Sequence, residues 1–119
     1  MSYELAFWSG GDELDPLEAY RRLDAEPMEP VPGLRAVDPA EVDRAIVEVL
    51  EGWTRDGIHL HPPGVEIGSA PVFEMHIGRH IARFFGYGIE EGDHFNAIID
   101  VMRPLGYRLF DPQTNERFG

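Results

Sequence analysis

The sequence of 119 residues contains no cysteine and no lysine, and it has no apolar run near the roughly 20 residues that a membrane-spanning helix requires. Without cysteine the chain forms no disulfide, zinc ribbon or thiol nucleophile, so its stability must come from ordinary packing. The first residues also lack the basic segment that opens a secretory signal. We therefore expect one soluble domain over residues 1–119, located in the cytoplasm.

Positive charge is also scarce. Ten arginines stand against 22 acidic residues, which gives a formal net charge of -12. Residues 1–66 hold 15 acids and 5 arginines, whereas residues 67–119 hold 7 acids and 5 arginines. Phosphate groups would repel such a chain, which argues against direct binding to nucleic acid or to an anionic membrane. The charge favours a basic protein as partner. The alternative is that it only keeps a small protein soluble.

The first half of the chain predicts a strand followed by two helices. Residues 3, 5 and 7 are apolar, whereas residues 4, 6 and 8 are of mixed polarity, and Ser9-Gly10-Gly11 follows. This alternation predicts an inner strand with one clearly apolar face. Asp15-Pro16 and Asp38-Pro39 each place a capping aspartate before a proline at the first helical position, which predicts helices over 15–24 and from 38 to a stop near Gly52. The prolines between them enforce an extended connection.

Residues 72–86 fit two structures. Apolar residues at helical spacing suggest a helix, but Gly78 interrupts it. In a hairpin, Gly78-Arg79 would form a two-residue turn and Glu74 would lie opposite Arg83. The hairpin accounts for more residues, so we predict it, preceded by a short strand over 58–60.

The last third predicts a helix and a final strand. Asp93 can cap a helix that Pro104 and Gly106 end, and a strand over 107–110 leads into the turn Asp111-Pro112-Gln113-Thr114-Asn115. The predicted order is β-α-α-β-β-β-α-β. We therefore expect an α+β fold, a mostly antiparallel sheet with helices on one face.

The sequence offers little for catalysis. None of the three serines lies in a Gly-x-Ser-x-Gly elbow. His59 and His61 would share one face of a strand, but two imidazoles do not make a metal site, and a hairpin would point His76 and His80 to opposite faces. We therefore expect no catalytic residue, no metal and no cofactor. The alternative is a small metal-assisted hydrolase that uses His59, His61 and nearby acids.

Aromatic residues beside acids are the more promising feature. Trp8 ends the first strand beside Asp12, Glu13 and Asp15, and Tyr87 lies between two glycines after the hairpin. Aromatic side chains ringed by carboxylates suit a partner surface rich in arginine and lysine. We predict that these five residues bind a partner. The alternative is that Trp8 belongs to the core and that the acids are simply solvated.

Three segments carry a resemblance to known proteins: Tyr3-Glu4-Leu5-Ala6-Phe7-Trp8, Phe85-Gly86-Tyr87-Gly88, and Phe110-Asp111-Pro112-Gln113-Thr114-Asn115-Glu116-Arg117-Phe118. They resemble a group of small bacterial proteins that begin with a Tyr-Asp-Leu-x-Phe-Trp strand and end with Tyr-Asp-Pro-Gln-Thr-Gly-Glu-Arg. Several members of that group are similar to immunity proteins of polymorphic or contact-dependent toxin systems. The resemblance covers the N-terminal strand and the chain from about residue 73, and it bears on fold more than on mechanism. Asn115 stands where the pattern has glycine, and asparagine can adopt the left-handed conformation.

The resemblance implies a non-enzymatic, immunity-like protein that binds a cognate basic toxin, for example one that acts on nucleic acid, and covers its active site. An acidic protein would be steered quickly to the basic cleft of such a toxin. Besides the hydrolase, a third hypothesis is a general acidic protein-interaction module with no toxin partner.

Overall fold

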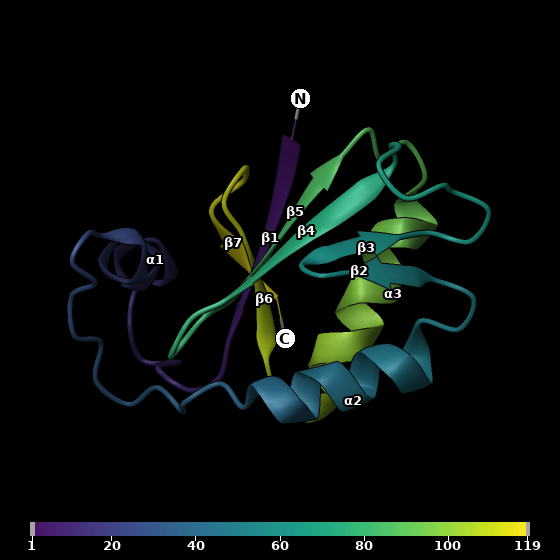
Figure 1. Cartoon of the computed structure of the whole chain (residues 1–119). Helices are drawn as coiled ribbons and strands as arrows, with labels where there is room; N and C mark the ends of the chain where they lie inside the picture. The colour runs from purple at the N-terminus through teal and green to yellow at the C-terminus, as the bar shows by residue number, and fades with distance from the viewer. Residues whose placement is uncertain (1, 119) are drawn as a thin grey trace.

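The computed structural model describes residues 2–118 as three helices and seven strands in one sheet (Figure 1). The strands are β1 (Ser2–Trp8), β2 (Thr54–Asp56), β3 (His59–His61), β4 (Val72–Ile77), β5 (Ala82–Tyr87), β6 (Arg108–Asp111) and β7 (Glu116–Arg117). The helices are α1 (Pro16–Asp24), α2 (Pro39–Val49) and α3 (Gly92–Met102), followed by the short 3-10 turn η1 (Arg103–Leu105). Within the described chain, no helix combines the length and apolar composition needed to cross a bilayer.

Two of the helices begin at the predicted caps. The Asp15 carboxylate accepts a hydrogen bond from the Glu18 amide at 3.1 Å, and the Asp38 carboxylate accepts one from the Ala40 amide at 3.0 Å. Proline has no backbone N–H. At the first position of a helix an N–H would have no helical acceptor, so the proline after each aspartate costs no hydrogen bond. Helix α3 differs from the prediction, because Glu91 occupies its cap position and Asp93 lies inside its first turn.

The sheet is antiparallel throughout, in the order β2-β3-β4-β5-β1-β6-β7. This confirms the predicted fold class and the inner position of β1, which pairs with β5 and β6. Strands β2 and β7 were not predicted. Both are short and lie at the edges of the sheet, where few side chains contribute an apolar pattern.

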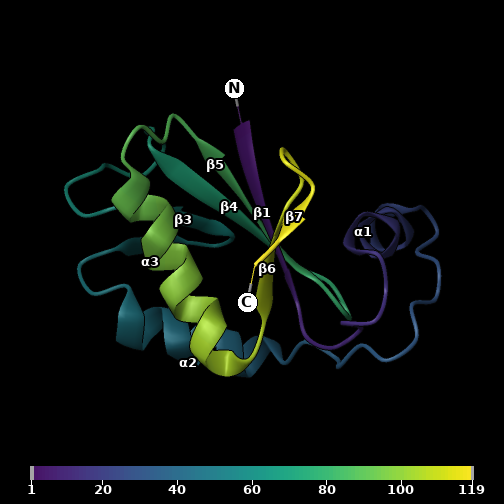
Figure 2. The same ribbon diagram turned by 180° about the vertical axis from the view of Figure 1, so that it is seen from behind.

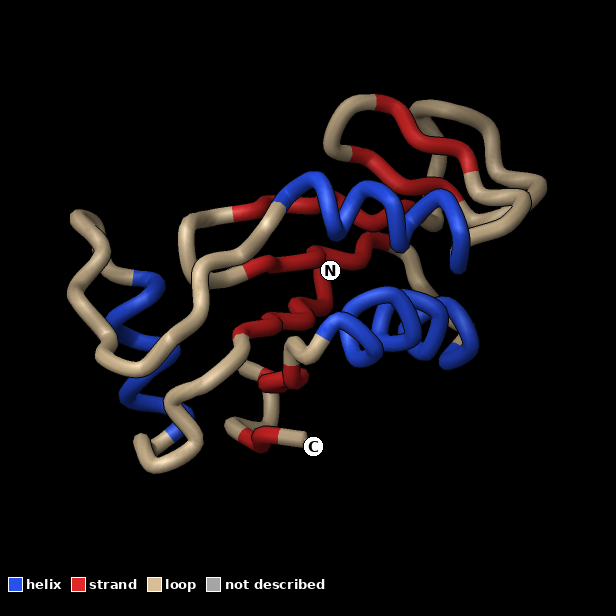
Figure 3. The backbone as a smooth tube through the Cα atoms, turned by 90° about the horizontal axis from the view of Figure 1, so that it is seen from below, coloured by secondary structure: helices blue, strands red, loops and turns tan. Residues whose placement is uncertain are grey.

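Apolar residues are buried on both faces of the sheet. Leu5 and Phe7 of β1 belong to the larger core, which α2 and α3 cover side by side (Figure 3). Ala6 and Trp8 belong to a second core with Ala19 and Leu23 of α1 and with Phe110. Helix α1 therefore lies on the face opposite α2 and α3 (Figure 2), and the expectation that all helices share one face was wrong.

The predicted hairpin is confirmed, but its register is wrong by two residues. The loop spans residues 78–81, where the Gly78 amide donates to the Ile81 carbonyl at 2.8 Å. Because the loop has four residues and not two, Glu74 lies opposite Phe85, and Arg83 lies opposite His76. A shift of two residues leaves each side chain on the same face, so Phe73, Met75, Ala82 and Phe84 still lie together in the core.

The turn after β6 forms as expected. Asp111 Oδ1 accepts a hydrogen bond from the Gln113 amide at 2.9 Å, and the Asp111 carbonyl accepts one from the Asn115 amide at 2.7 Å. Asn115 has φ 59°, the left-handed conformation in which asparagine can replace glycine. The turn brings β7 back against β6.

A polar cluster fixes α1 to the sheet. The Tyr20 hydroxyl donates to the Glu4 carboxylate, whose two oxygens both lie at 2.9 Å, and Arg83 Nε lies 3.4 Å from Glu4 Oε2. The Arg83 guanidinium also bonds Asp24 at the end of α1. Burial raises the pKa of Glu4 more than Tyr20 and Arg83 lower it. The ionised form of the mostly buried Glu4 carboxylate therefore depends on both partners for its stability.

We expect Arg83→Gln to lower the free energy of unfolding by about 1–3 kcal/mol, because it leaves the Glu4 and Asp24 carboxylates without their cation. Urea denaturation measures the change. Arg21→Gln is the matched control, since it removes an exposed guanidinium from α1 that has no side-chain partner in the described chain. Equal losses in the two variants would contradict the assigned role of the cluster. Combining Arg83→Gln with Glu4→Gln should cost less than the sum of the single changes.

Candidate functional site

Trp8 lies in the core and not at a surface. Its side chain is 0% exposed and packs on Phe110, with ring centroids 5.3 Å apart. The Arg117 guanidinium carbon lies 4.3 Å from the centroid of the Trp8 ring, and its Nη2 donates to the Trp8 carbonyl at 2.9 Å. Desolvation lowers the pKa of Arg117 to about 10. The prediction that Trp8 is a partner-binding anchor is therefore corrected, because α1 covers the second face of β1.

Tyr87 is exposed, but it lies far from the predicted acids. Its partner across the sheet is Ser2, at the beginning of β1, whereas Asp12 follows the end of β1. The length of β1 separates the two ends by about 20 Å, at roughly 3.4 Å per residue. The structure therefore does not gather Tyr87 and the acids into one site.

The three predicted acids remain exposed, in different roles. Asp12 forms an ion pair with Arg108 at 2.6 Å, and Asp15 caps α1. The side chain of Glu13 makes no hydrogen bond or ion pair with the described residues. Their loop lies against a later segment, because Gly10 pairs with Leu34.

These acids belong to a longer acidic segment, which consists of α1 and the two loops that flank it; Figure 1 shows the course of this segment. Residues 12–38 contain eight acids and three arginines, a net charge of -5. Arg22 pairs with Glu18, and Arg35 donates to the Leu105 carbonyl at 2.7 Å, so two of these arginines are engaged within the chain. We call the exposed carboxylates of this segment the acidic surface: Asp12, Glu13, Asp15, Glu18, Asp24, Glu26, Glu29 and Asp38.

His59 and His61 share one face of β3, as predicted, but they face different neighbours. His61 is buried, and its Nε2 accepts from the Gly68 amide at 3.4 Å. His59 Nε2 lies 3.6 Å from Glu74, whose other oxygen is 2.5 Å from His76 Nε2. Residues 2–118 contain no group of three histidine or acidic side chains placed to hold a metal ion. The hydrolase alternative therefore gains no support.

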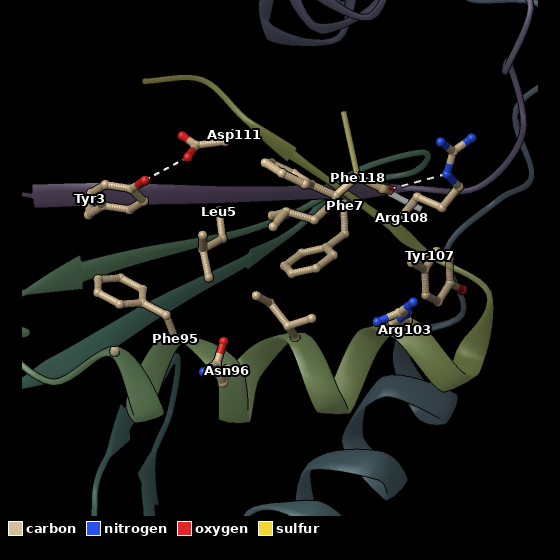
Figure 4. Close-up of a pocket in the computed structure, with 13 residues that line it drawn as sticks. Tyr3, Leu5, Phe7, Phe95, Asn96, Arg103, Tyr107, Arg108, Asp111 and Phe118 are labelled. Atoms are coloured by element: carbon tan, nitrogen blue, oxygen red, sulfur yellow. Dashed lines mark hydrogen bonds between the residues drawn. The ribbon is translucent and has the colours of Figure 1, made fainter. Parts of the chain in front are cut away.

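A cleft of about 610 Å³ lies between α3 and the strands β1 and β6 (Figure 4). Its floor includes Leu5, Phe7 and Tyr107, which are almost completely buried. Its walls are half-buried apolar side chains, namely Tyr3, Phe95, Ile99 and Leu109, together with the more exposed Phe118. A space of this size with a mainly apolar lining is typical of small-molecule sites.

Polar groups lie at the two ends of the cleft (Figure 4). At one end the Tyr3 hydroxyl donates to Asp111 Oδ2 at 2.6 Å, and this hydrogen bond together with burial raises the pKa of Tyr3 to about 12. At the other end are Arg108, which donates to the Phe118 carbonyl and pairs with Asp12, and Arg103. The Arg103 guanidinium has no hydrogen bond or ion pair with the described residues and is exposed.

Sequence reasoning missed this cleft. Its lining comes from the first strand and from residues about a hundred positions later, and no local pattern joins them. One signal was present: the apolar stripe of α3 is wider than its buried set of Ile98, Val101 and Met102, which leaves Phe95 and Ile99 to line an open space.

Comparisons with known proteins provide no relatives. No protein-family model, curated protein sequence or solved structure matches the chain significantly.

We expect Trp8→Ala to lower the free energy of unfolding by about 3–5 kcal/mol, because it empties the core beneath α1 and removes the surface on which Arg117 stacks. Chemical denaturation of the purified variant provides the measurement. Tyr87→Ala, which truncates an exposed aromatic, should change stability by no more than about 0.5 kcal/mol. If Trp8→Ala were equally mild, the core assignment would be wrong.

We expect the purified protein, after removal of any tag, to carry less than one equivalent of zinc, manganese or nickel, because residues 2–118 place no third ligand beside His59 and His61. Elemental analysis by mass spectrometry gives the metal content. One tightly bound equivalent that is lost in His61→Ala but retained in His94→Ala would restore the hydrolase hypothesis.

Proposed function

We propose that the chain is a non-enzymatic, immunity-like protein of the cytoplasm, which binds a basic protein toxin through the acidic surface and covers the toxin's active site. The observation that carries the proposal is the concentration of exposed carboxylates on residues 12–38, which contain eight acidic residues and three arginines. The resemblance of the chain ends to immunity-like proteins points the same way.

Electrostatics explains how such a surface would act. Exposed like charges create a field that accelerates the encounter with a basic cleft, and they oppose binding to nucleic acid. The side chains of Glu13, Glu26 and Glu29 have no partner among the described residues, so no bond within the chain must break before they engage a cation.

Apolar contact within this surface can come from Met28. Its side chain is 40% exposed and lies between Glu26 and Glu29 in the extended connection after α1. Methionine adapts its shape to irregular surfaces, and burial of an apolar side chain slows dissociation. In this proposal Met28 takes the role that the sequence alone suggested for Trp8.

The structure changes the choice of variants that test the acidic surface. Asp12 and Asp15 are needed for an ion pair and a helix cap, so the cleaner reversal is Glu13→Lys, Glu26→Lys and Glu29→Lys in one protein. The control protein carries Glu66→Lys, Glu90→Lys and Asp100→Lys, which change the net charge equally at exposed positions outside residues 12–38.

We expect the first variant to associate about tenfold more slowly with the toxin encoded beside its gene, and to lose most of the salt dependence, whereas the control stays close to the unmodified protein. Stopped-flow mixing at several salt concentrations measures both effects. Association that is independent of salt, or equally slowed in both variants, would refute the role of the acidic surface.

A growth assay separates immunity from a general interaction module. Co-expression of the unmodified chain should rescue cells from the adjacent toxin, and the Glu13, Glu26 and Glu29 reversal should not. Binding without rescue would leave the interaction module as the better description.

A further inference from the structure

The cleft between α3, β1 and β6 exposes apolar surface that the fold itself does not cover. Tyr3, Phe95, Ile99 and Leu109 pack against the core with only part of their surface, and the remainder lines the cleft. Leu5 and Phe7 beneath them are fully buried and give the cleft a firm floor. Burial of this lining by a ligand would contribute roughly 25 cal/mol for each Å² removed from water.

The charges around the cleft distinguish between possible occupants. Asp111 is satisfied by the Tyr3 hydroxyl and by Gln113, so it needs no cation from a ligand. Arg108 is paired with Asp12. Arg103 is therefore the one cleft charge without a partner in the described chain, and it is positive.

The position of Arg103 also favours an anionic ligand. Figure 4 shows the Arg103 side chain at the end of the cleft opposite Tyr3 and Asp111, with the apolar lining between the two ends. A molecule lying along the cleft could thus place an apolar body on Phe95 and Ile99 and one anionic group at Arg103. Asp12, the carboxylate of the acidic surface that reaches this end of the cleft, is paired with Arg108.

We propose that this cleft binds a small amphipathic anion, with an apolar body on the apolar lining and a single carboxylate at the Arg103 guanidinium. The cleft touches the acidic surface at one point, the Arg108–Asp12 ion pair, but none of Glu13, Glu26 and Glu29 lines it, so the proposal does not require the toxin partner. A cationic or neutral molecule of the same shape would lack the Arg103 contact.

Three probes of matched length test the head group: octanoate, 1-octanol and octylammonium. Titration of the ¹⁵N-labelled chain, followed by amide chemical shifts, locates each probe and gives its dissociation constant. We expect octanoate to bind about tenfold more tightly than 1-octanol, with octylammonium weakest and with the largest shifts at residues 95–109. Equal affinities, no saturation, or shifts elsewhere on the chain would overturn the proposal.

Two pairs of variants then test the residues. Arg103→Gln should weaken octanoate to the level of 1-octanol and leave 1-octanol unchanged, whereas Arg21→Gln removes the same charge from α1 and should affect neither. Ile99→Trp should fill the cleft and abolish binding of both probes, whereas Val47→Trp adds the same bulk at a position on α2 that is 79% exposed. If Arg103→Gln and Arg21→Gln bound octanoate equally well, the assigned head-group contact would be wrong even if Ile99→Trp failed to fold.

Discussion

The second half of strand β1, residues 5–8, is apolar on both faces, and water must be excluded from each of them. Leu5 and Phe7 face α2 and α3, whereas Ala6 and Trp8 face α1. Such a strand needs a layer of helix on each side. The chain must therefore pass from one face of the sheet to the other between two of its helices. The proline-rich connection after α1 serves this purpose. The acidic surface lies on α1 and the segments beside it because these parts wrap around the outside of the sheet.

Three of the ten arginines hold distant parts of this acidic chain together. Arg83 joins Glu4 and Asp24, Arg108 joins Asp12, and Arg117 stacks on Trp8 and bonds its carbonyl. Arg83 and Arg108 therefore neutralise two carboxylates of the acidic surface, Asp24 and Asp12, whereas Glu13, Glu26 and Glu29 have no cation among the described residues. Guanidinium groups suit this use because they bond carboxylates and backbone carbonyls and stack on aromatic rings with a single planar group.

The elements were predictable from sequence where local chemistry determines them. An aspartate before a proline defined the starts of α1 and α2, and the Asp111 turn followed from side-chain bonding to nearby amides. The hairpin register was not predictable, because loops of two and four residues bury the same side chains. The face of Trp8 required knowledge of where α1 lies. The cleft brings together both ends of the chain, so no sequence window contains it.

The two outermost strands have a consequence for self-association. A seven-stranded sheet exposes unpaired backbone amides and carbonyls along both margins, and such margins recruit further strands from other molecules. Here the margins are β2, with three exposed residues, and β7, with only two residues, one of them acidic and the other arginine. Neither is long enough to template a new strand, and both are charged. The short, charged edge strands therefore disfavour the addition of strands from other molecules, even at high protein concentration.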